Sequence, residues 1–558
     1  MTLESLSPLQ SEIESIFVDY IRIQSYTNTP DEKRVEPFLS EWFSSQDYFS
    51  NHPEMWGLYP LEQDILKRHV VWGMVKGQGD DTIVMIHHSD VVEIEDFELA
   101  KPFAHDIKQI NHHIRTMIHK FDPEAMEDLD SGLWQFGRGT ADMKAGGAIQ
   151  LALLKHYSRQ PDFRGNLIVL CLPDEENLSA GMRSALSLLG ELKHQHNLNY
   201  RLMINSEPHQ STDPDHGVVY EGSVGKLMPV VYARGSLAHV GRIFEGLNPV
   251  HLMSELVTAT ELNMAFSDTM DGEAAPPPSW LYLKDTKTHY DVSIPTAIRA
   301  YMSILTLTSS PEHLVQKLKT AAERAFDTVL TRMNQSFSAY LEATGQDAGT
   351  LPWKRHVKTF AELFSTVADA EGPGFINAYQ AYLEQINQSL AGGAITLAHA
   401  SFALIEFCLD HYKNKLPIMI IGLSPPYYPD VNNQRIGTKN PVVKDLVPAI
   451  QRFTLDTLGQ AYISRQFYTG ISDLSYTWLD PDVDLSGSVA ANMPLWGSAY
   501  QINFQRIKDI CMPCINIGPW GKDFHKLTER VLIRDLYERT PLIIDFTIRQ
   551  ILNNHQSL

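Results

Sequence analysis

The chain has 558 residues, of which 43% are hydrophobic and 20% are charged, a composition typical of globular proteins. Because this length exceeds what one ordinary hydrophobic core can organise, we expect two or more domains. The formal net charge is -21. Such a charge argues against nucleic acid or an anionic membrane as a partner, since both attract basic surfaces.

The first residues contain neither a basic stretch nor an apolar one, so no signal peptide is predicted. No run approaches the roughly 18 apolar residues that a membrane span needs. Of the four cysteines, Cys511 and Cys514 form a C-x-x-C inside an apolar run. No second pair completes a zinc site, so we expect buried free thiols. These features together predict a cytoplasmic protein.

Strands and helices alternate over the first part of the chain. After a helical region over residues 1–50, apolar runs predict strands at 70–75, 81–90, 166–176 and 200–208, and apolar periodicity predicts helices at 148–157 and 181–192. This alternation predicts an α/β domain with a mostly parallel central sheet. Residues 99–135 are polar and irregular, and we expect them to form a surface insertion.

The pattern changes after residue 213. Extended segments at 217–234, 280–283 and 289–307 alternate with helices at 249–263 and 311–332, which predicts an inserted α+β domain. A helix-rich insertion at about 335–415 follows, with helices near 360–370, 375–389 and 394–412, then a strand at 416–423. Pro425, Pro426 and Pro429 are expected to break the structure and mark the return to the first domain.

The α/β pattern then resumes, with a helix at 442–458, a strand at 510–517 and a final helix at 530–552. The predicted organisation is a catalytic domain formed by residues 1–213 and 430–558. A lid domain, residues 214–429, interrupts it.

Polar side chains follow the ends of several predicted strands. They are His88 and Asp90, the run Asp174-Glu175-Glu176, Glu207 and His525, and Asp142 lies in a Gly-rich turn before a helix. Ligands of open α/β sheets gather outside the carboxyl ends of the strands, so we expect these side chains to converge. Histidine and carboxylate without cysteine suit Zn²⁺ or a similar divalent ion. There are enough ligands for two ions that share a carboxylate.

Taken alone, each feature has a simpler explanation. Asp174, Glu175 and Glu176 could form a solvated acidic loop, and Asp142 could cap the following helix. His87 faces away from His88 on an extended strand, so we interpret it as structural. No H-E-x-x-H or G-x-S-x-G motif is present.

The motifs in order resemble those of the M20 metallopeptidase family, which includes carboxypeptidases, dipeptidases and aminoacylases. They are His88-Ser-Asp90, Gly137-Arg-Gly-Thr-Ala-Asp-Met-Lys144, Asp174-Glu-Glu176, Glu207-Pro208, and Gly518-Pro519 followed by His525 and Glu529. The length and the long insertions resemble the arginine-utilisation (RocB-type) branch of the family.

The resemblance implies a role for each residue. Asp142 would bridge two zinc ions, His88 and Glu207 would complete one ion, and Glu176 and His525 the other; Co²⁺ and Mn²⁺ are alternatives to Zn²⁺. Asp90 would hydrogen-bond His88. Glu175 would act as the general base on a water molecule and then protonate the leaving amine. Apart from the resemblance, we expect Arg138 and Lys144 to be structural partners of the acidic residues rather than catalytic, and Glu529 could simply pair with Lys526 or Arg530.

The inserted domain resembles the family's lid, in which His239 would stabilise the oxyanion of the intermediate. Gly470-Ile-Ser-Asp473 resembles a substrate-side loop. The resemblance implies a homodimer formed through the lid or, if residues 335–415 cover that surface, a monomer. The predicted function is cleavage of an amide bond in a small peptide or N-acyl amino acid, in amino-acid catabolism. The alternative is a binding or regulatory protein without turnover.

Overall fold

The computed structural model describes residues 7–115, 117, 123–211, 213, 215–437, 441–480 and 485–552. The chain divides into two compact units. The first unit comprises Met1–Val224, Val431–Leu479 and Asn503–Leu558, and the second comprises Gly225–Asp430 and Asp480–Ile502. The predicted domain boundaries, after residues 213 and 429, lie near the unit boundaries that follow Val224 and Asp430. Residues 480–502, however, belong to the second unit, although the sequence placed them in the catalytic domain.

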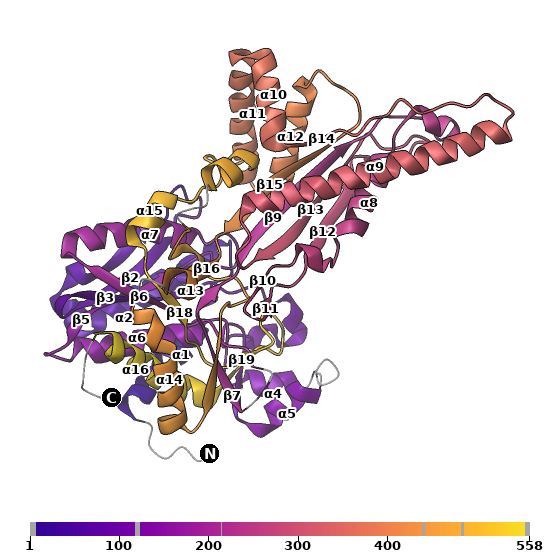
Figure 1. The fold of residues 1–558 in the computed structure, drawn as a ribbon. Helices are drawn as coiled ribbons and strands as arrows, with labels where there is room; N and C mark the ends of the chain where they lie inside the picture. The colour runs from indigo at the N-terminus through magenta and orange to yellow at the C-terminus, as the bar shows by residue number, and fades with distance from the viewer. Residues whose placement is uncertain are drawn as a thin grey trace. The chain divides into compact units, whose positions relative to one another are not determined.

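The first unit is built on an eight-stranded sheet in the order β1-β2-β5-β3-β6-β18-β7-β17 (Figure 1). Its strands are β1 (Trp56–Pro60), β2 (His69–Lys76), β3 (Gln78–His88), β5 (Arg164–Leu172), β6 (Asn199–Asn205), β7 (His216–Tyr220), β17 (Ala461–Arg465) and β18 (Cys514–Asn516). The four central strands β5, β3, β6 and β18 are mutually parallel, and β7 and β17 are also parallel to each other. The pairings of β1 with β2, of β2 with β5 and of β18 with β7 are antiparallel. The prediction of a mostly parallel central sheet is confirmed.

Helices cover both faces of this sheet, as the burial of the central strands requires. One face carries α1 (Pro8–Ile21), α2 (Val35–Ser45), α6 (Lys144–Ser158), α14 (Pro441–Phe453) and α16 (Thr540–Leu552), which share a core with the sheet. The other carries α7 (Ala180–His196), against which α15 (Phe504–Ile510) packs. The remaining helices of the unit are α3 (Asp47–Asn51), α4 (Ile110–Arg115), α5 (Pro123–Ser131) and α13 (Asn433–Gly437).

Two glycines let α6 approach the sheet closely. A Cβ atom on Gly147 would lie 2.5 Å from the ring of His87 on β3, and one on Gly146 would lie 2.3 Å from the carbonyl oxygen of Ser206. Only glycine avoids both collisions. The start of α6, directly after Asp142, is thereby held at the carboxyl ends of β3 and β6.

Three predictions for the first unit were wrong. Residues 99–135 are not an irregular surface insertion, because α4, α5 and β4 (Trp134–Phe136) surround a hydrophobic cluster of their own that includes Phe97, Ile110 and Trp134. The segment 530–552 begins as a strand, β20 (Arg530–Leu532), before a π-helical turn and α16. The strand predicted at 510–517 covers only β18, since residues up to Ile510 belong to α15.

The short strands of the first unit form two further sheets. β20 pairs with β4 and with β19 (Gly521–Lys522), in the order β19-β20-β4. β8 (Gly222–Ser223) pairs with β16 (Val431–Asn432).

The second unit contains a five-stranded sheet in the order β12-β13-β9-β15-β14. The strands are β9 (Gly225–Arg234), β12 (Ser279–Asp285), β13 (Ala297–Thr306), β14 (Val357–Thr359) and β15 (Ile418–Tyr428), with a small hairpin of β10 (Thr269–Met270) and β11 (Glu273–Ala274). Pro425 and Pro426 lie inside β15 and do not end it, contrary to the prediction. Both continue the extended chain, which fits the backbone angles that proline favours.

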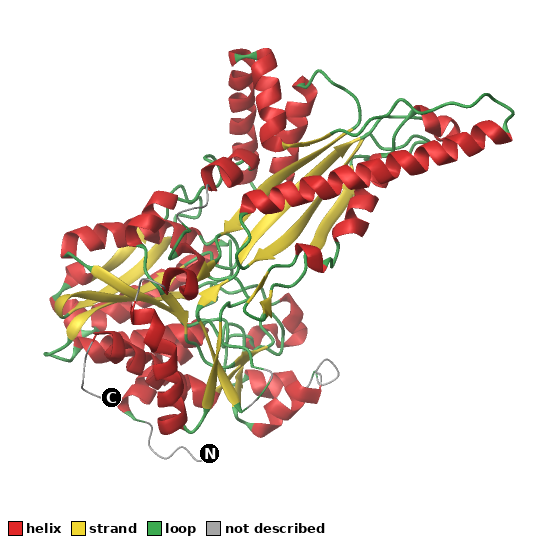
Figure 2. Cartoon of the chain, in the orientation of Figure 1, coloured by secondary structure: helices red, strands yellow, loops and turns green. Residues whose placement is uncertain are grey.

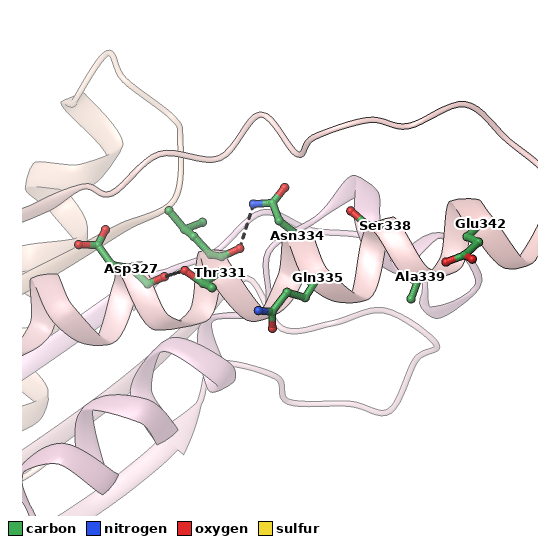
Figure 3. Close-up of a pocket in the computed structure, with 8 residues that line it drawn as sticks. Asp327, Thr331, Asn334, Gln335, Ser338, Ala339 and Glu342 are labelled. Carbon is green, nitrogen blue, oxygen red and sulfur yellow. Dashed lines mark hydrogen bonds between the residues drawn. The ribbon is translucent and has the colours of Figure 1, made fainter.

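Helices cover this sheet on both faces. α10 (Phe360–Glu371), α11 (Pro373–Ala391) and α12 (Leu397–His411) form one core with alternate residues of β9 and β15, among them Val230, Tyr232 and Ile420. α8 (Pro249–Thr260) and the long α9 (Pro311–Ala343) pack on the other face (Figure 2). The predicted helical insertion is therefore integral to the core of the second unit. Polar and apolar residues of α9 between Asp327 and Glu342 line a hollow of about 850 Å³ (Figure 3). No helix in the described part of the chain is long and apolar enough to cross a membrane.

Candidate dinuclear metal site

The predicted site residues of the first unit meet at one edge of its central sheet. β5, β3, β6 and β18 run parallel and lie side by side, so their carboxyl ends share this edge. His88 ends β3, Glu176 follows β5 and Glu207 follows β6. Asp142 precedes α6, and His525 lies in the hairpin between β19 and β20. The sequence correctly predicted this convergence.

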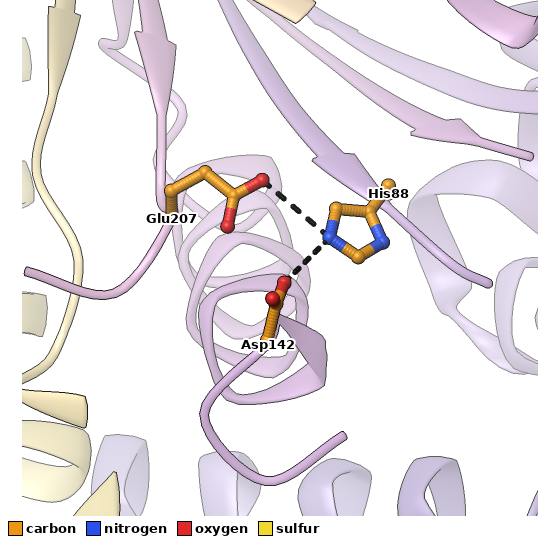
Figure 4. A group of neighbouring side chains, drawn as sticks. All are labelled: His88, Asp142 and Glu207. Carbon is orange, nitrogen blue, oxygen red and sulfur yellow. Dashed lines mark hydrogen bonds and ion pairs between the residues drawn. The ribbon is translucent and has the colours of Figure 1, made fainter. Parts of the chain in front are cut away.

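Asp142, His88 and Glu207 form the first group of potential metal ligands (Figure 4). The Nε2 atom of His88 lies 2.8 Å from Oδ1 of Asp142 and 3.4 Å from Oε1 of Glu207. One atom from each residue lies within 4.8 Å of the others. The second oxygen of Glu207 is buried and has no hydrogen-bond partner among the residues that the structure describes. A buried, unpaired carboxylate oxygen is costly, and a cation would remove that cost.

Asp142, Glu176 and His525 form the second group. The Nε2 atom of His525 lies 2.8 Å from Oε1 of Glu176 and 3.3 Å from Oδ2 of Asp142. Asp142 therefore directs one oxygen to each histidine. This is the geometry expected of a carboxylate that bridges two ions, and the nitrogen and oxygen donors suit zinc, cobalt or manganese.

The electrostatics of the site reflect crowded negative charge. Burial raises the pKa values of Glu175 and Glu207 well above their ordinary range, and neighbouring carboxylates add to the effect. Hydrogen bonds to Asp142 and Glu176 raise the pKa of His525 to about 10. The positive charges of the imidazolium groups thus offset the negative charge of the carboxylates, a role that bound divalent ions would otherwise have.

Glu175 directly precedes the potential ligand Glu176 in the chain but belongs to neither ligand group. Its side chain is partly buried and, among the residues that the structure describes, forms no hydrogen bond or ion pair. His88 and Glu207 are its strongest charged neighbours. A carboxylate so placed is available to a water molecule or a substrate at the site.

Comparison with known proteins bears on this arrangement. Residues 88–360 match the model of peptidase family M20/M25/M40. The chain is similar to this family over that range. The match and the two ligand groups together support a metal-dependent hydrolase.

Two full-length relatives come from Bacillus subtilis (strain 168). The uncharacterized protein YqjN is 29% identical over 558 residues, covering 98% of each chain. Protein RocB is 26% identical over 553 residues, covering 98% of this chain and 95% of its own. Both likenesses include the inserted segments, since they span nearly the whole chain.

Solved structures share the fold of this chain. Aminopeptidase PepT from Bacillus cereus ATCC 10987 aligns with a TM-score of 0.50 at 11% identity, covering 98% of this chain and 100% of its own. The M20 family metallo-carboxypeptidase Sso-CP2 from Sulfolobus solfataricus aligns with a TM-score of 0.51 at 10% identity, covering 97% and 98%.

Asp90 supports the candidate metal site differently from what the resemblance implied. Nδ1 of His88 lies 3.0 Å from the backbone carbonyl oxygen of Asp90 and 3.7 Å from its carboxylate. The carboxylate instead accepts backbone N–H bonds from Glu175 (3.1 Å) and Glu176 (3.3 Å). The backbone of Asp90 thus orients the histidine, and its side chain orients the Glu175–Glu176 turn.

The predicted structural residues have defined partners. Arg138 pairs with Glu529 at 2.7 Å, and Glu529 also accepts the backbone N–H of Asp142 at 3.2 Å. The predicted pairing of Glu529 with Lys526 or Arg530 was therefore wrong. His87 is buried against Gln150, as expected of a structural residue. The expectation of two buried thiols holds for Cys514 only, because Cys511 is exposed at the end of α15.

Two further predicted site residues, Asp473 and His239, lie in different units. Asp473, in the loop after β17, is buried in the first unit, and its Oδ1 atom has no partner within the described part of the chain. His239 belongs to the second unit, where it is exposed and accepts the backbone N–H of Gly241 at 3.0 Å. Its catalytic role remains a prediction.

Arg68 supports the Asp174–Glu176 turn, and the sequence did not reveal it. Its buried guanidinium lies 2.8 Å from Asp174, 2.6 Å from Glu32 and 2.8 Å from Asp64. Burial and the nearby Asp90 raise the pKa of Glu32 to about 9. Glu32 also accepts the backbone N–H of Asp174 at 2.9 Å. An arginine before a predicted strand gives no signal of such a role, since its partners come from distant segments.

Replacement of Arg68 by Met should lower the free energy of unfolding by about 3–5 kcal/mol, because it leaves buried carboxylates without their cation. Urea unfolding would measure the loss. Arg22→Met is the matched control, since Arg22 and its partner Asp19 are more than half exposed and such surface pairs contribute at most about 1 kcal/mol. Equal stability of the two variants would contradict this role of Arg68.

Proposed function

We propose that this protein is an M20-type hydrolase that holds two divalent ions, with Zn²⁺ favoured over Co²⁺ or Mn²⁺, and cleaves an amide bond in a small peptide or N-acyl amino acid. The observation that carries the proposal is the position of Asp142, with one oxygen 2.8 Å from His88 and the other 3.3 Å from His525. A carboxylate between two such groups is the arrangement that dinuclear hydrolases use.

The residues fit the two ions. His88, Asp142 and Glu207 would hold one, and Asp142, Glu176 and His525 the other. Coordination would satisfy the unpaired oxygen of Glu207 and offset the mutual repulsion of the buried carboxylates. When bound, such ions polarise a carbonyl group and lower the pKa of water from about 15.7 towards about 7.

Glu175 is the proposed general base. It would take a proton from the attacking water and then deliver that proton to the nitrogen of the leaving amine, so that the amide gives a carboxylic acid and an amine. Asp90 supports this role by holding the backbone N–H groups of Glu175 and Glu176. The turn is thereby kept rigid, which favours productive geometry.

The substrate class rests on the family match and on the sequence resemblance to the arginine-utilisation branch. Arginine- and glutamate-derived N-acyl amino acids and dipeptides are therefore the first compounds to test.

Treatment with a chelator should abolish hydrolysis, and added zinc, cobalt or manganese should restore it. The measurement is release of free amine from a panel of dipeptides and N-acyl amino acids, with bound metal counted in the same samples. Two ions per chain without turnover of any amide would contradict the proposed activity and favour a binding role.

The Glu175→Gln variant should retain both ions and lose at least about 100-fold in kcat, since a general base contributes roughly 10²–10⁴-fold. Metal content and kcat would be measured together. Glu54→Gln, which changes an exposed glutamate of the same unit, should behave like the unchanged protein. Undiminished kcat in Glu175→Gln would rule out this assignment.

The His239→Ala variant should lose roughly 100-fold or more in kcat with unchanged metal content, if this histidine stabilises the oxyanion. His289→Ala removes another exposed histidine of the second unit and should leave kcat unchanged. A similar kcat for both variants would remove His239 from the mechanism.

A further inference from the structure

His525 is the most exposed of the five potential ligands. Its side chain is 49% exposed, whereas those of Asp142 and Glu176 are 11% and 10% exposed. The other ligands stand at the ends of buried strands or before a helix, but His525 stands on a hairpin loop. Its position must therefore be determined by whatever holds that hairpin.

The hairpin joining β19 and β20 has an unusual backbone. Asp523 and His525 both have positive φ angles, 55° and 63°. Residues other than glycine rarely adopt this region, because the Cβ atom makes it unfavourable. Surrounding contacts have to stabilise this conformation.

Arg530 supplies contacts inside the hairpin. Its side chain is 1% exposed, and its guanidinium lies 2.5 Å from the carboxylate of Asp523. The same nitrogen donates to the carbonyl oxygen of Thr528 at 3.0 Å. Arg530 therefore ties together the two sides of the loop that carries His525.

Asp128 holds Arg530 from outside the hairpin. It lies on α5, in the segment 94–136, of which residues 99–135 were predicted to form a surface insertion. Its Oδ2 atom accepts from Nε of Arg530 at 2.7 Å and from Nζ of Lys522 at 2.8 Å. One carboxylate thus neutralises a cation on each strand of the hairpin.

Two aromatic rings strengthen the attachment, Trp134 from the same segment and Trp520 directly before β19. Nζ of Lys522 lies 4.4 Å from the ring centre of Trp134 and 4.9 Å from that of Trp520. Leu527, within the loop, joins the hydrophobic cluster of the 94–136 segment. Cation–π contacts of this kind are attractive.

We infer that the 94–136 segment acts as a positioning element for the metal site, with Asp128 holding the His525 hairpin through Arg530 and Lys522. This inference rests on the proposed function. Partners one step removed from the metal typically change its affinity about 10- to 100-fold. The two ions should respond differently, because the network contacts the hairpin and not His88 or Glu207.

The test is equilibrium dialysis of chelator-treated full-length protein against buffered Zn²⁺, with bound metal counted per chain. Asp128→Asn should weaken one ion about 10- to 100-fold and leave the other within about twofold. His525→Ala, which removes the ligand itself, identifies the affected ion as that of the second group. Glu124→Gln is the matched control, because Glu124 contacts the same Lys522 at 2.7 Å from an exposed position and should leave both ions unchanged.

Binding of both ions by Asp128→Asn within twofold of the unchanged protein would overturn the inference, as would equal weakening of both. Should Asp128→Asn fail to fold, as shown by circular dichroism, Asp128→Glu replaces it, with a smaller but still selective loss expected. An unchanged protein that binds fewer than two ions would instead contradict the proposed function, so the two failures are distinguishable.

Discussion

The first unit is organised around the cost of burying carboxylates together. Asp142, Glu176 and Glu207 approach one another at the carboxyl ends of parallel strands, where burial raises the pKa values of the two glutamates. Such a cluster is stable only with positive charge among its members. The histidines provide part of that charge, and the unpaired oxygen of Glu207 indicates where more is needed. The repulsion among these buried carboxylates destabilises the fold, and for the same reason the cluster attracts cations.

Further charges hold this cluster in place without joining it. Arg68 fixes the turn that leads to Glu175 and Glu176 by way of Asp174. Glu529, paired with Arg138, receives the backbone N–H of Asp142. These supports fix the direction of the Glu175–Glu176 turn and of Asp142 as well as neutralise charge, since hydrogen bonds to a carboxylate fix its orientation. Precise placement of ligands depends on this layer, because the ligands' own side chains have several rotatable bonds.

The long segments beyond the strand-end motifs are also integrated into the fold. Residues 94–136 have a hydrophobic core and share a sheet with the hairpin that carries His525. In the second unit, α10, α11 and α12 bury one face of the sheet through Val230, Tyr232 and Ile420. These segments have polar surfaces and irregularly spaced apolar residues, because amphipathic helices bury only one side. Hydrophobic periodicity therefore did not predict that they belong to the cores. Likewise Pro425 and Pro426 resemble a break but occupy an extended strand.

The sequence by itself determined the mostly parallel sheet and the convergence of His88, Asp142, Glu176, Glu207 and His525, because apolar runs predict strands and parallel strands place their ends at one edge. Only the tertiary structure decided what supports these ligands. Arg68 meets Asp174 across 106 positions of the chain, and Arg530 meets Asp128 across 402. Pairing of charges over such separations leaves no periodic trace in the sequence. It depends on distances in space, which are set only when the whole unit has folded.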